Sequence, residues 1–241
     1  MVPEDKKLFF EQEGYLVLNS ILDEEELPFY TGLYDDFLDG KYDLTNLRSD
    51  LSGVNRKSGE LITQIMHPSR VYPKLIGKPM HKKGLEVAKQ LMGEDMVLDF
   101  DMLINKPPKS NKPTPWHQDA AYWIDLPDKR ALSIWFALDE ATLENGCMWY
   151  TPKSHLEPLK KHFQTEGTGA LKCEGTEENS VATPLKPGSC VIHQGKTLHY
   201  SRGNSTNGHR RAFILNFRPE SMVKLEREQG FDHSGKRSVR S

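Results

Sequence analysis

Residues 131–138 have the sequence Ala-Leu-Ser-Ile-Trp-Phe-Ala-Leu. An apolar run of this length, rich in large side chains, is typical of a buried β-strand. Met96 to Ile104 is also apolar, interrupted by Asp99 and Asp101, and predicts a second strand. Four more strands are predicted at 147–150, 189–193, 197–201 and 210–217. Strands at such short spacing indicate a β-fold in this half of the chain.

Turn signals separate these strands. Asn145-Gly146 and Pro187-Gly188 each precede a predicted strand. Asn207-Gly208 favours a tight turn, so the segments 197–201 and 210–217 are predicted to form a hairpin. Residues 155–182 carry many charges and glycines with little periodicity, and we interpret them as a long surface loop of the kind that often forms a lid or binding loop.

The first half of the chain predicts helices. Residues 4–13 form the first, ended by Gly14, and a short strand follows at 15–18. Asp23 is a candidate cap for a second helix, and 40–60 is expected to be loop. A third helix is expected within 73–92. Helices followed by strands predict a mainly β fold, closed or double-sheet, with an N-terminal helical layer.

Composition narrows the functional class. The chain has 241 residues, is 37% hydrophobic and 27% charged, and carries a net charge of −2, so no nucleic-acid partner is indicated. No apolar run reaches the roughly 20 residues that span a bilayer. Three cysteines without a Cys-x-x-Cys pair favour a reducing compartment, and we expect a cytoplasmic monomer. We expect one domain over 1–241, with a core at about 8–218 and a tail at 219–241, in which the basic run 235–240 is solvated.

His117-Gln118-Asp119 is the central chemical signal. In an extended segment, residues two apart project from one face, so an imidazole and a carboxylate can reach one metal ion. Two histidines and one carboxylate leave positions open for other ligands, which is the arrangement of non-haem Fe(II) oxygenases. A lone His-x-Asp also occurs by chance in many proteins. We take His199 as the third ligand and His193 as its main competitor.

Arg210 is the candidate carboxylate partner, because a guanidinium offers a rigid fork of donors. Residues 210, 212, 214 and 216 share one side of a predicted strand, whereas Arg211 points the other way. Ser201, on the same face as His199, is a further candidate donor. No metal role is expected for the remaining histidines. His67 and His81 precede the β-region, and four others are predicted to be exposed: His155, His162, His209 and His233.

The chain resembles the phytanoyl-CoA dioxygenase family over about residues 8–218, especially the short members of that family. The motif Met102-Leu103-Ile104-Asn105-Lys106-Pro107-Pro108 leads into Trp116-His117-Gln118-Asp119. Later matching pieces are Trp135, residues 139–147, Pro152-x-Ser154-His155, and Gly188 through His199-x-Ser201 to Arg210.

The resemblance implies a double-stranded β-helix, or jelly roll, with flanking helices. It implies Fe(II) on His117, Asp119 and His199, with 2-oxoglutarate and O2 as co-substrates. Two sets of residues would serve 2-oxoglutarate. Its distal carboxylate would meet Arg210 and Ser201, and its pocket would be lined by Met102 and Trp135. The family also has an upstream lysine that contacts the co-substrate, and its nearest equivalent here is at about Gln64, which is not a lysine.

Asp119 narrows the expected reaction, because halogenating relatives lack the carboxylate ligand. We therefore expect hydroxylation of a small-molecule substrate, with release of succinate and CO2. Two alternatives stay open: a cupin-like metal site without 2-oxoglutarate, and a non-catalytic binding or regulatory protein on the same fold. The segments 40–62, 106–116 and 155–182 are expected to decide the substrate. Lys106, Lys109 and Lys112 would attract an anionic one, although a solvated loop is the plainer interpretation.

Overall fold

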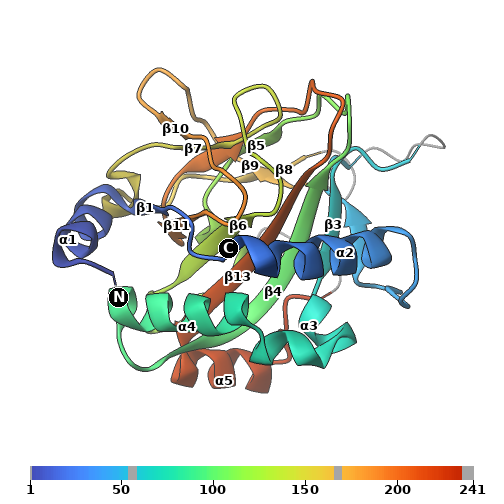
Figure 1. Cartoon of the computed structure of the whole chain (residues 1–241). Coiled ribbons are helices and arrows are strands. Elements are labelled where there is room, and N and C mark those ends of the chain that lie inside the picture. Colours follow the sequence, from blue (N-terminus) through green and yellow to red (C-terminus); the bar gives the residue numbers. More distant parts are fainter. Residues whose placement is uncertain (1, 54–58, 166–169, 235–241) are drawn as a thin grey trace.

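The computed structural model describes residues 2–53, 59–165 and 170–234. Its described part contains two main antiparallel sheets, with helices against the larger one (Figure 1). The α-helices are α1 (Glu4–Glu13), α2 (Leu27–Leu38), α3 (Pro68–Val71), α4 (Pro79–Met92) and α5 (Glu220–Glu228). Short 3-10 turns are η1 (Glu24–Glu26), η2 (Pro73–Gly77), η3 (Asp119–Tyr122) and η4 (Ser154–Leu156).

The larger sheet has seven strands in the order β1-β11-β6-β13-β4-β3-β2. Their bounds are β1 (Tyr15–Leu18), β11 (Cys190–Gln194), β6 (Leu132–Ala137), β13 (Arg210–Pro219), β4 (Met96–Lys106), β3 (Thr63–Met66) and β2 (Arg48–Asp50). The smaller sheet has the order β10-β7-β12-β5. Its strands are β10 (Val181–Thr183), β7 (Met148–Tyr150), β12 (His199–Ser201) and β5 (Thr114–His117), and β8 (Phe163–Gln164) pairs separately with β9 (Leu171–Lys172).

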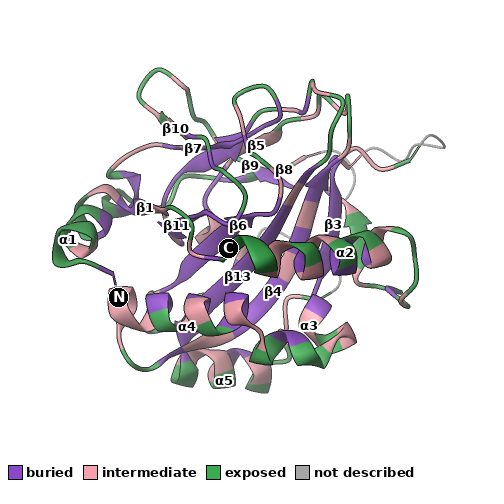
Figure 2. Cartoon of the chain, in the orientation of Figure 1, coloured by how far each residue is buried: buried purple, intermediate pink, exposed green. Residues whose placement is uncertain are grey.

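Alternation along the strands gives the larger sheet two different faces. On β6, Ile134 and Phe136 join the core beneath the helices, whereas Trp135 and Ala137 join the core that faces the smaller sheet. On β13, Leu215 likewise lies on the helix side. The helices thus cover one face of the larger sheet, and Figure 2 shows its strands buried and the outer helix surfaces exposed. The other face of the larger sheet packs against the smaller sheet, and a site can form between the two.

The expected mainly β fold with an N-terminal helical layer is confirmed. The first helix and first strand have the predicted bounds, 4–13 and 15–18, and the other predicted elements lie within a few residues of theirs. Gly14 ends α1 with a φ of 81°, in the left-handed region that favours glycine. Among the described residues, no helix is long and apolar enough to cross a membrane.

Three predictions were wrong. The segments 197–201 and 210–217 do not form a hairpin, because β12 pairs with β5 and β7 in the smaller sheet and β13 pairs with β4 and β6 in the larger one. The expected loop 40–60 contains β2, which pairs with β3. The expected tail begins with helix α5, whose Glu226 is fully buried. The basic run 235–240 lies outside the described residues.

Candidate metal centre

Three predicted ligands converge between the two sheets. His117 ends β5, His199 begins the neighbouring β12, and the two residues face each other in register. Asp119 begins η3, so the turn carries the carboxylate back toward the imidazoles. Asp119 Oδ1 lies 3.7 Å from His117 Nε2 and 3.6 Å from His199 Nε2. One ligand atom from each residue lies within 4.8 Å of the others, so this group could hold a metal ion.

Backbone carbonyls orient both imidazoles. Nδ1 of His117 donates to Pro115 O at 2.8 Å, and Nδ1 of His199 donates to Thr197 O at 2.8 Å. A carbonyl can only accept, so Nδ1 carries the proton and Nε2 presents a lone pair in each ring. Metal-binding histidines are commonly fixed in this way. The donor set therefore fits a divalent transition metal.

Electrostatics keep these groups in the required states. Burial lowers the pKa of His117 to about 4, and it lowers that of His199 well below its usual value, so both are neutral at physiological pH. Burial alone would raise the pKa of Asp119, but the hydrogen bond from His193 and the surrounding imidazole rings hold it below its usual value. An ionised carboxylate beside two neutral imidazoles is what a metal cation requires.

Asp119 is also oriented through its second oxygen. Ser133 on β6 donates from Oγ to Asp119 Oδ2 at 2.7 Å. Asn216 on β13 in turn donates from Nδ2 to Ser133 Oγ at 2.9 Å. His193 on β11 also approaches Asp119 Oδ2, with its Nε2 at 3.1 Å. The carboxylate is therefore held by the larger sheet, and Oδ1 remains directed at the two histidines.

Arg210 is buried in the wall of a cavity that the three candidate ligands also line. Its side chain is 1% exposed, and its carbon Cζ lies 5.1 Å from the ring centre of Trp135. Burial lowers the pKa of Arg210 to about 10, so it remains charged at neutral pH. Its Nε and Nη1 have no hydrogen-bond partner among the described residues. Buried donors without partners are costly, so this guanidinium fits an anion that enters the cavity.

Lys106 is a second buried basic residue, opposite Arg210 in the larger sheet; the sequence offered it as a residue that would attract an anion but favoured a solvated loop. It is fully buried rather than part of a solvated loop, and it pairs in register with Arg210. Its Nζ donates to Ser201 Oγ at 2.8 Å. Burial, together with the charge of Arg210, lowers its pKa well below the usual value. This contact holds the Ser201 hydroxyl in place, and Ser201 and Arg210 line the same cavity. By contrast, Lys109 is exposed and donates to Ser205 O.

One cavity brings the predicted residues together. It is lined by all three candidate ligands and by the five candidate co-substrate residues: Gln64, Met102, Trp135, Ser201 and Arg210. Gln64 Nε2 donates to Met102 Sδ at 3.1 Å, so its amide is oriented within the cavity. Arg211 points to the opposite face, where it pairs with Asp139 and Asp35.

Among the described residues, the segments 40–62, 106–116 and 155–182, which are expected to shape the substrate pocket, each contribute one residue to the cavity lining: Leu51, Thr114 and Ala170.

The histidine predictions need correction. His209 is exposed as predicted, but His155 and His162 are each 7% exposed, and the His233 side chain is also 7% exposed. His162 accepts a hydrogen bond from the Gln118 amide at its Nε2, so the long loop packs against the segment that carries the candidate ligands His117 and Asp119. His193 and His233 line the cavity. Polar and glycine-rich sequence around these residues concealed their burial.

Comparisons with known proteins agree with this geometry. The family model described as Phytanoyl-CoA dioxygenase (PhyH) matches residues 10–212. A Caenorhabditis elegans protein named "Probable phytanoyl-CoA dioxygenase" is 25% identical, and the match covers 94% of this chain and 78% of that protein. The crystal structure of EvdO2 from Micromonospora carbonacea var. aurantiaca, complexed with 2-oxoglutarate, is 30% identical with a TM-score of 0.76. That match covers 90% of this chain and 91% of EvdO2.

A more distant structure shows the same fold. The epimerase SnoN, in complex with Fe3+, alpha ketoglutarate and nogalamycin RO, has a TM-score of 0.71 at 23% identity, covering 89% of this chain and 82% of SnoN. The expected jelly roll is thus confirmed, as two open sheets rather than a closed barrel. The matched family depends on iron and 2-oxoglutarate and uses O2.

Proposed function

The chain belongs to the phytanoyl-CoA dioxygenase (PhyH) family, and on that premise we propose that it is a 2-oxoglutarate-dependent dioxygenase that hydroxylates a small-molecule substrate. His117, Asp119 and His199 bind Fe(II), and Arg210 with Ser201 binds the distal carboxylate of 2-oxoglutarate. Trp135, Met102 and Gln64 line the co-substrate end of the cavity. Bound iron and 2-oxoglutarate supply the oxidising chemistry, in which O2 hydroxylates the substrate and 2-oxoglutarate leaves as succinate and CO2.

One observation carries the proposal. Two imidazole lone pairs and one carboxylate oxygen converge in a cavity whose wall also holds a buried arginine with unpaired donors. A metal alone would explain the first feature but not the second. A metal chelated by a dianionic 2-oxo acid explains both, because the far carboxylate needs a fork of donors away from the metal.

The chain's own residues hold and orient the reactants. The larger sheet fixes Arg210 and the smaller sheet fixes Ser201 before binding, which reduces the conformational entropy that co-substrate binding costs. The rest of the cavity favours a substrate with a hydrophobic body, because most other lining side chains are apolar. They include Leu51, Met66, Phe100, Ile104, Trp123 and Met148.

Hydroxylation is the favoured outcome because Asp119 keeps the carboxylate ligand that halogenating relatives lack. SnoN, which shares the fold, is named an epimerase, so the fold also supports a reaction other than hydroxylation. A single domain, a monomer and a cytoplasmic location stay predictions. The cupin-like site and the non-catalytic protein are the outcomes that would replace the oxygenase.

Anaerobic titration with Fe(II) and 2-oxoglutarate tests the proposal. We expect the weak visible charge-transfer band of a chelated 2-oxo acid, and we expect His199→Ala to abolish it. Arg210→Lys should weaken 2-oxoglutarate binding about tenfold or more, because lysine cannot supply the fork of charged donors. Arg211→Lys is the matched control, since it alters the adjacent arginine on the opposite face.

The outcomes separate the alternatives. If folded, metal-loaded protein shows no band, 2-oxoglutarate is not the co-substrate and the cupin-like metal site is the remaining interpretation. If the protein does not bind Fe(II) tightly, the non-catalytic binding or regulatory protein is the remaining interpretation. A band without succinate formation across a broad substrate panel would contradict hydroxylation while retaining the co-substrate site.

A further inference from the structure

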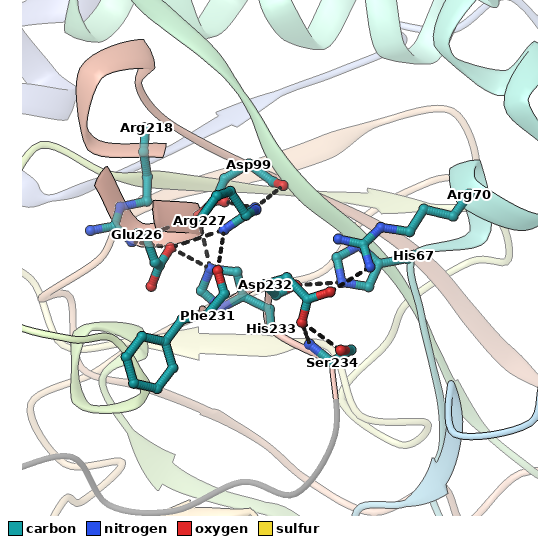
Figure 3. A network of polar contacts seen from close by, with 10 residues as sticks. All are labelled: His67, Arg70, Asp99, Arg218, Glu226, Arg227, Phe231, Asp232, His233 and Ser234. Atoms are coloured by element: carbon teal, nitrogen blue, oxygen red, sulfur yellow. Dashed lines mark hydrogen bonds and ion pairs between the residues drawn. The ribbon is translucent and has the colours of Figure 1, made fainter. Parts of the chain in front are cut away.

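The segment that follows α5 returns to the cavity. Residues 231–234 turn back toward β4 and the start of α3, where Figure 3 shows their partners, and His233 and Ser234 line the same cavity as His117 and Asp119. The family model ends at residue 212, so this segment lies beyond the matched part of the chain. A cavity wall supplied from there is a feature of this chain that the family match does not assign.

His233 is held by two buried carboxylates. Its Nε2 lies 3.0 Å from Asp99 Oδ2 and 2.9 Å from Glu226 Oε2, and both carboxylate side chains are fully buried. Arg218 approaches both from β13, with its Nη1 3.1 Å from Glu226 and 3.7 Å from Asp99. Arg227 also pairs with both. Figure 3 shows this network between α5, β4 and the returning segment.

A second anchor holds the preceding residue. His67 Nε2 donates to the Asp232 carbonyl at 2.7 Å, and Arg70 Nη1 pairs with the Asp232 carboxylate at 2.7 Å. Asp232 Oδ1 also accepts from the Ser234 amide at 3.0 Å, which makes a turn. The segment is therefore fastened at adjacent residues to two different parts of the fold.

Asp99, Glu226 and His233 are also close enough to one another to hold a metal ion. The charges favour an anchor instead. Both carboxylates already form ion pairs with Arg218 and Arg227, and two guanidinium cations would repel a metal cation at the same oxygens. Buried carboxylates paired with arginine and histidine are the expected form of a structural ion-pair network.

The anchored segment lies away from the co-substrate end of the cavity. The His233 ring is tilted against Phe100, with ring centres 4.2 Å apart. Phe100 on β4 is in register with Asn216 on β13, six residues from Arg210, or roughly 20 Å along the strand. Trp123, another lining residue, lies over the Arg218 guanidinium at 5.1 Å and so links the network to the cavity.

We propose that His233 and Ser234 form the wall that closes the substrate end of the cavity, held in place by the buried Asp99 and Glu226 carboxylates and the Asp232 anchor. This wall limits how far a substrate extends beyond the metal centre, so it is a determinant of substrate size. The inference rests on the proposed function, because it takes the same cavity as the substrate pocket.

Hydrogen exchange tests the anchor. In the full-length protein, His233→Ala should raise the exchange rates of the amides at 231–234 about tenfold or more, because hydrogen bonds to charged groups shift local equilibria by at least that factor. His233→Gln keeps a donor at the same place and should largely restore protection. Lys224→Ala, an exposed change on α5, is the matched control.

Acrylamide quenching of tryptophan fluorescence tests the wall. His233→Ala should increase quenching, and the increase should disappear when Trp123→Phe is added, because Trp123 is the reporter beside the network. If His233→Ala fails to fold, Asp232→Asn weakens the partly exposed Arg70 pair and should give a smaller increase.

Two results would overturn the inference. The first is faster amide exchange in His233→Ala without greater tryptophan quenching, which would mean that the network anchors the segment but that the segment does not close the cavity. The second is no change in either measurement. Neither result affects the Fe(II) and 2-oxoglutarate band, so failure of the wall and failure of the proposed function are distinguishable.

Discussion

Asp119 depends on a hydroxyl that lies fourteen residues away in the chain. Ser133 donates to Asp119 Oδ2, and this bond turns Oδ1 toward the two histidines. Mutation of a group that orients a metal ligand commonly lowers metal affinity about 10- to 100-fold. We therefore expect Ser133→Ala to weaken Fe(II) binding about 10- to 100-fold, as measured by anaerobic titration.

Ser205→Ala is the matched control, because Ser205 is exposed and its hydroxyl donates to the Glu144 carbonyl. Equal Fe(II) affinities for the two variants would show that Asp119 needs no support from β6. A loss in Ser133→Ala that is matched by a loss of folded protein would instead indicate a role in stability.

At this scale the sequence predicted the convergence of the three candidate ligands, but not the residues that support them. His117, Asp119 and His199 converge as expected, because strand alternation and motif spacing are local properties. The burial of Lys106 and the roles of Ser133 and His233 were not predicted, since each depends on at least one partner that lies fourteen or more residues away in the sequence. Such partners emerge only from the pairing of strands.

Strand pairing is also where the prediction of elements failed. The turn signal at Asn207-Gly208 suggested a hairpin, but β12 and β13 enter different sheets. Asn204 explains part of the local structure, because its buried side chain donates to the carbonyls of Lys106, Pro107 and Gly208. The connection is thereby fastened to the end of β4 and crosses between the sheets. His199 and Arg210 still reach one cavity, from opposite walls.

Two Asn-Gly turns allow this difference to be measured. Gly146, before β7, has a φ of 93°, and an added Cβ would lie 2.3 Å from the Arg202 carbonyl oxygen. Gly208 has no atom within 4 Å of an added Cβ. We expect Gly146→Ala to lower the free energy of unfolding by roughly 1–3 kcal/mol, because it adds both backbone strain and a clash.

Gly208→Ala should change the free energy of unfolding by less than about 0.5 kcal/mol, as is usual for open surface positions. Urea unfolding of both variants is the measurement. Similar losses for the two would mean that the 207–208 turn constrains the crossing between sheets more tightly than its open surroundings indicate.

For the molecule as a whole, the network around His233 ties the C-terminal helix to the larger sheet and should make stability depend on pH. Burial lowers the pKa of His233, but hydrogen bonds to Asp99 and Glu226 outweigh it, so the pKa is raised above its usual 6.5. Burial raises the pKa of Asp99, but the hydrogen bond from His233 and the charges of His233, Arg227 and Arg218 lower it overall below 3.8.

The two shifts act at opposite ends of the pH scale. The contribution of His233 is fully present below about pH 6.5 and is lost as pH rises through its raised pKa. The contribution of Asp99 is present above about pH 4 and is lost as pH falls through its lowered pKa.

We expect the difference in unfolding free energy between wild type and His233→Gln to be largest between these limits and to shrink toward about pH 8.5. His209→Gln controls for the loss of an exposed histidine. A difference that stays constant from about pH 6 to about pH 8.5 would mean that an uncharged His233 holds the segment equally well, so that hydrogen bonding rather than ion pairing fastens α5 and the cavity wall to the sheet.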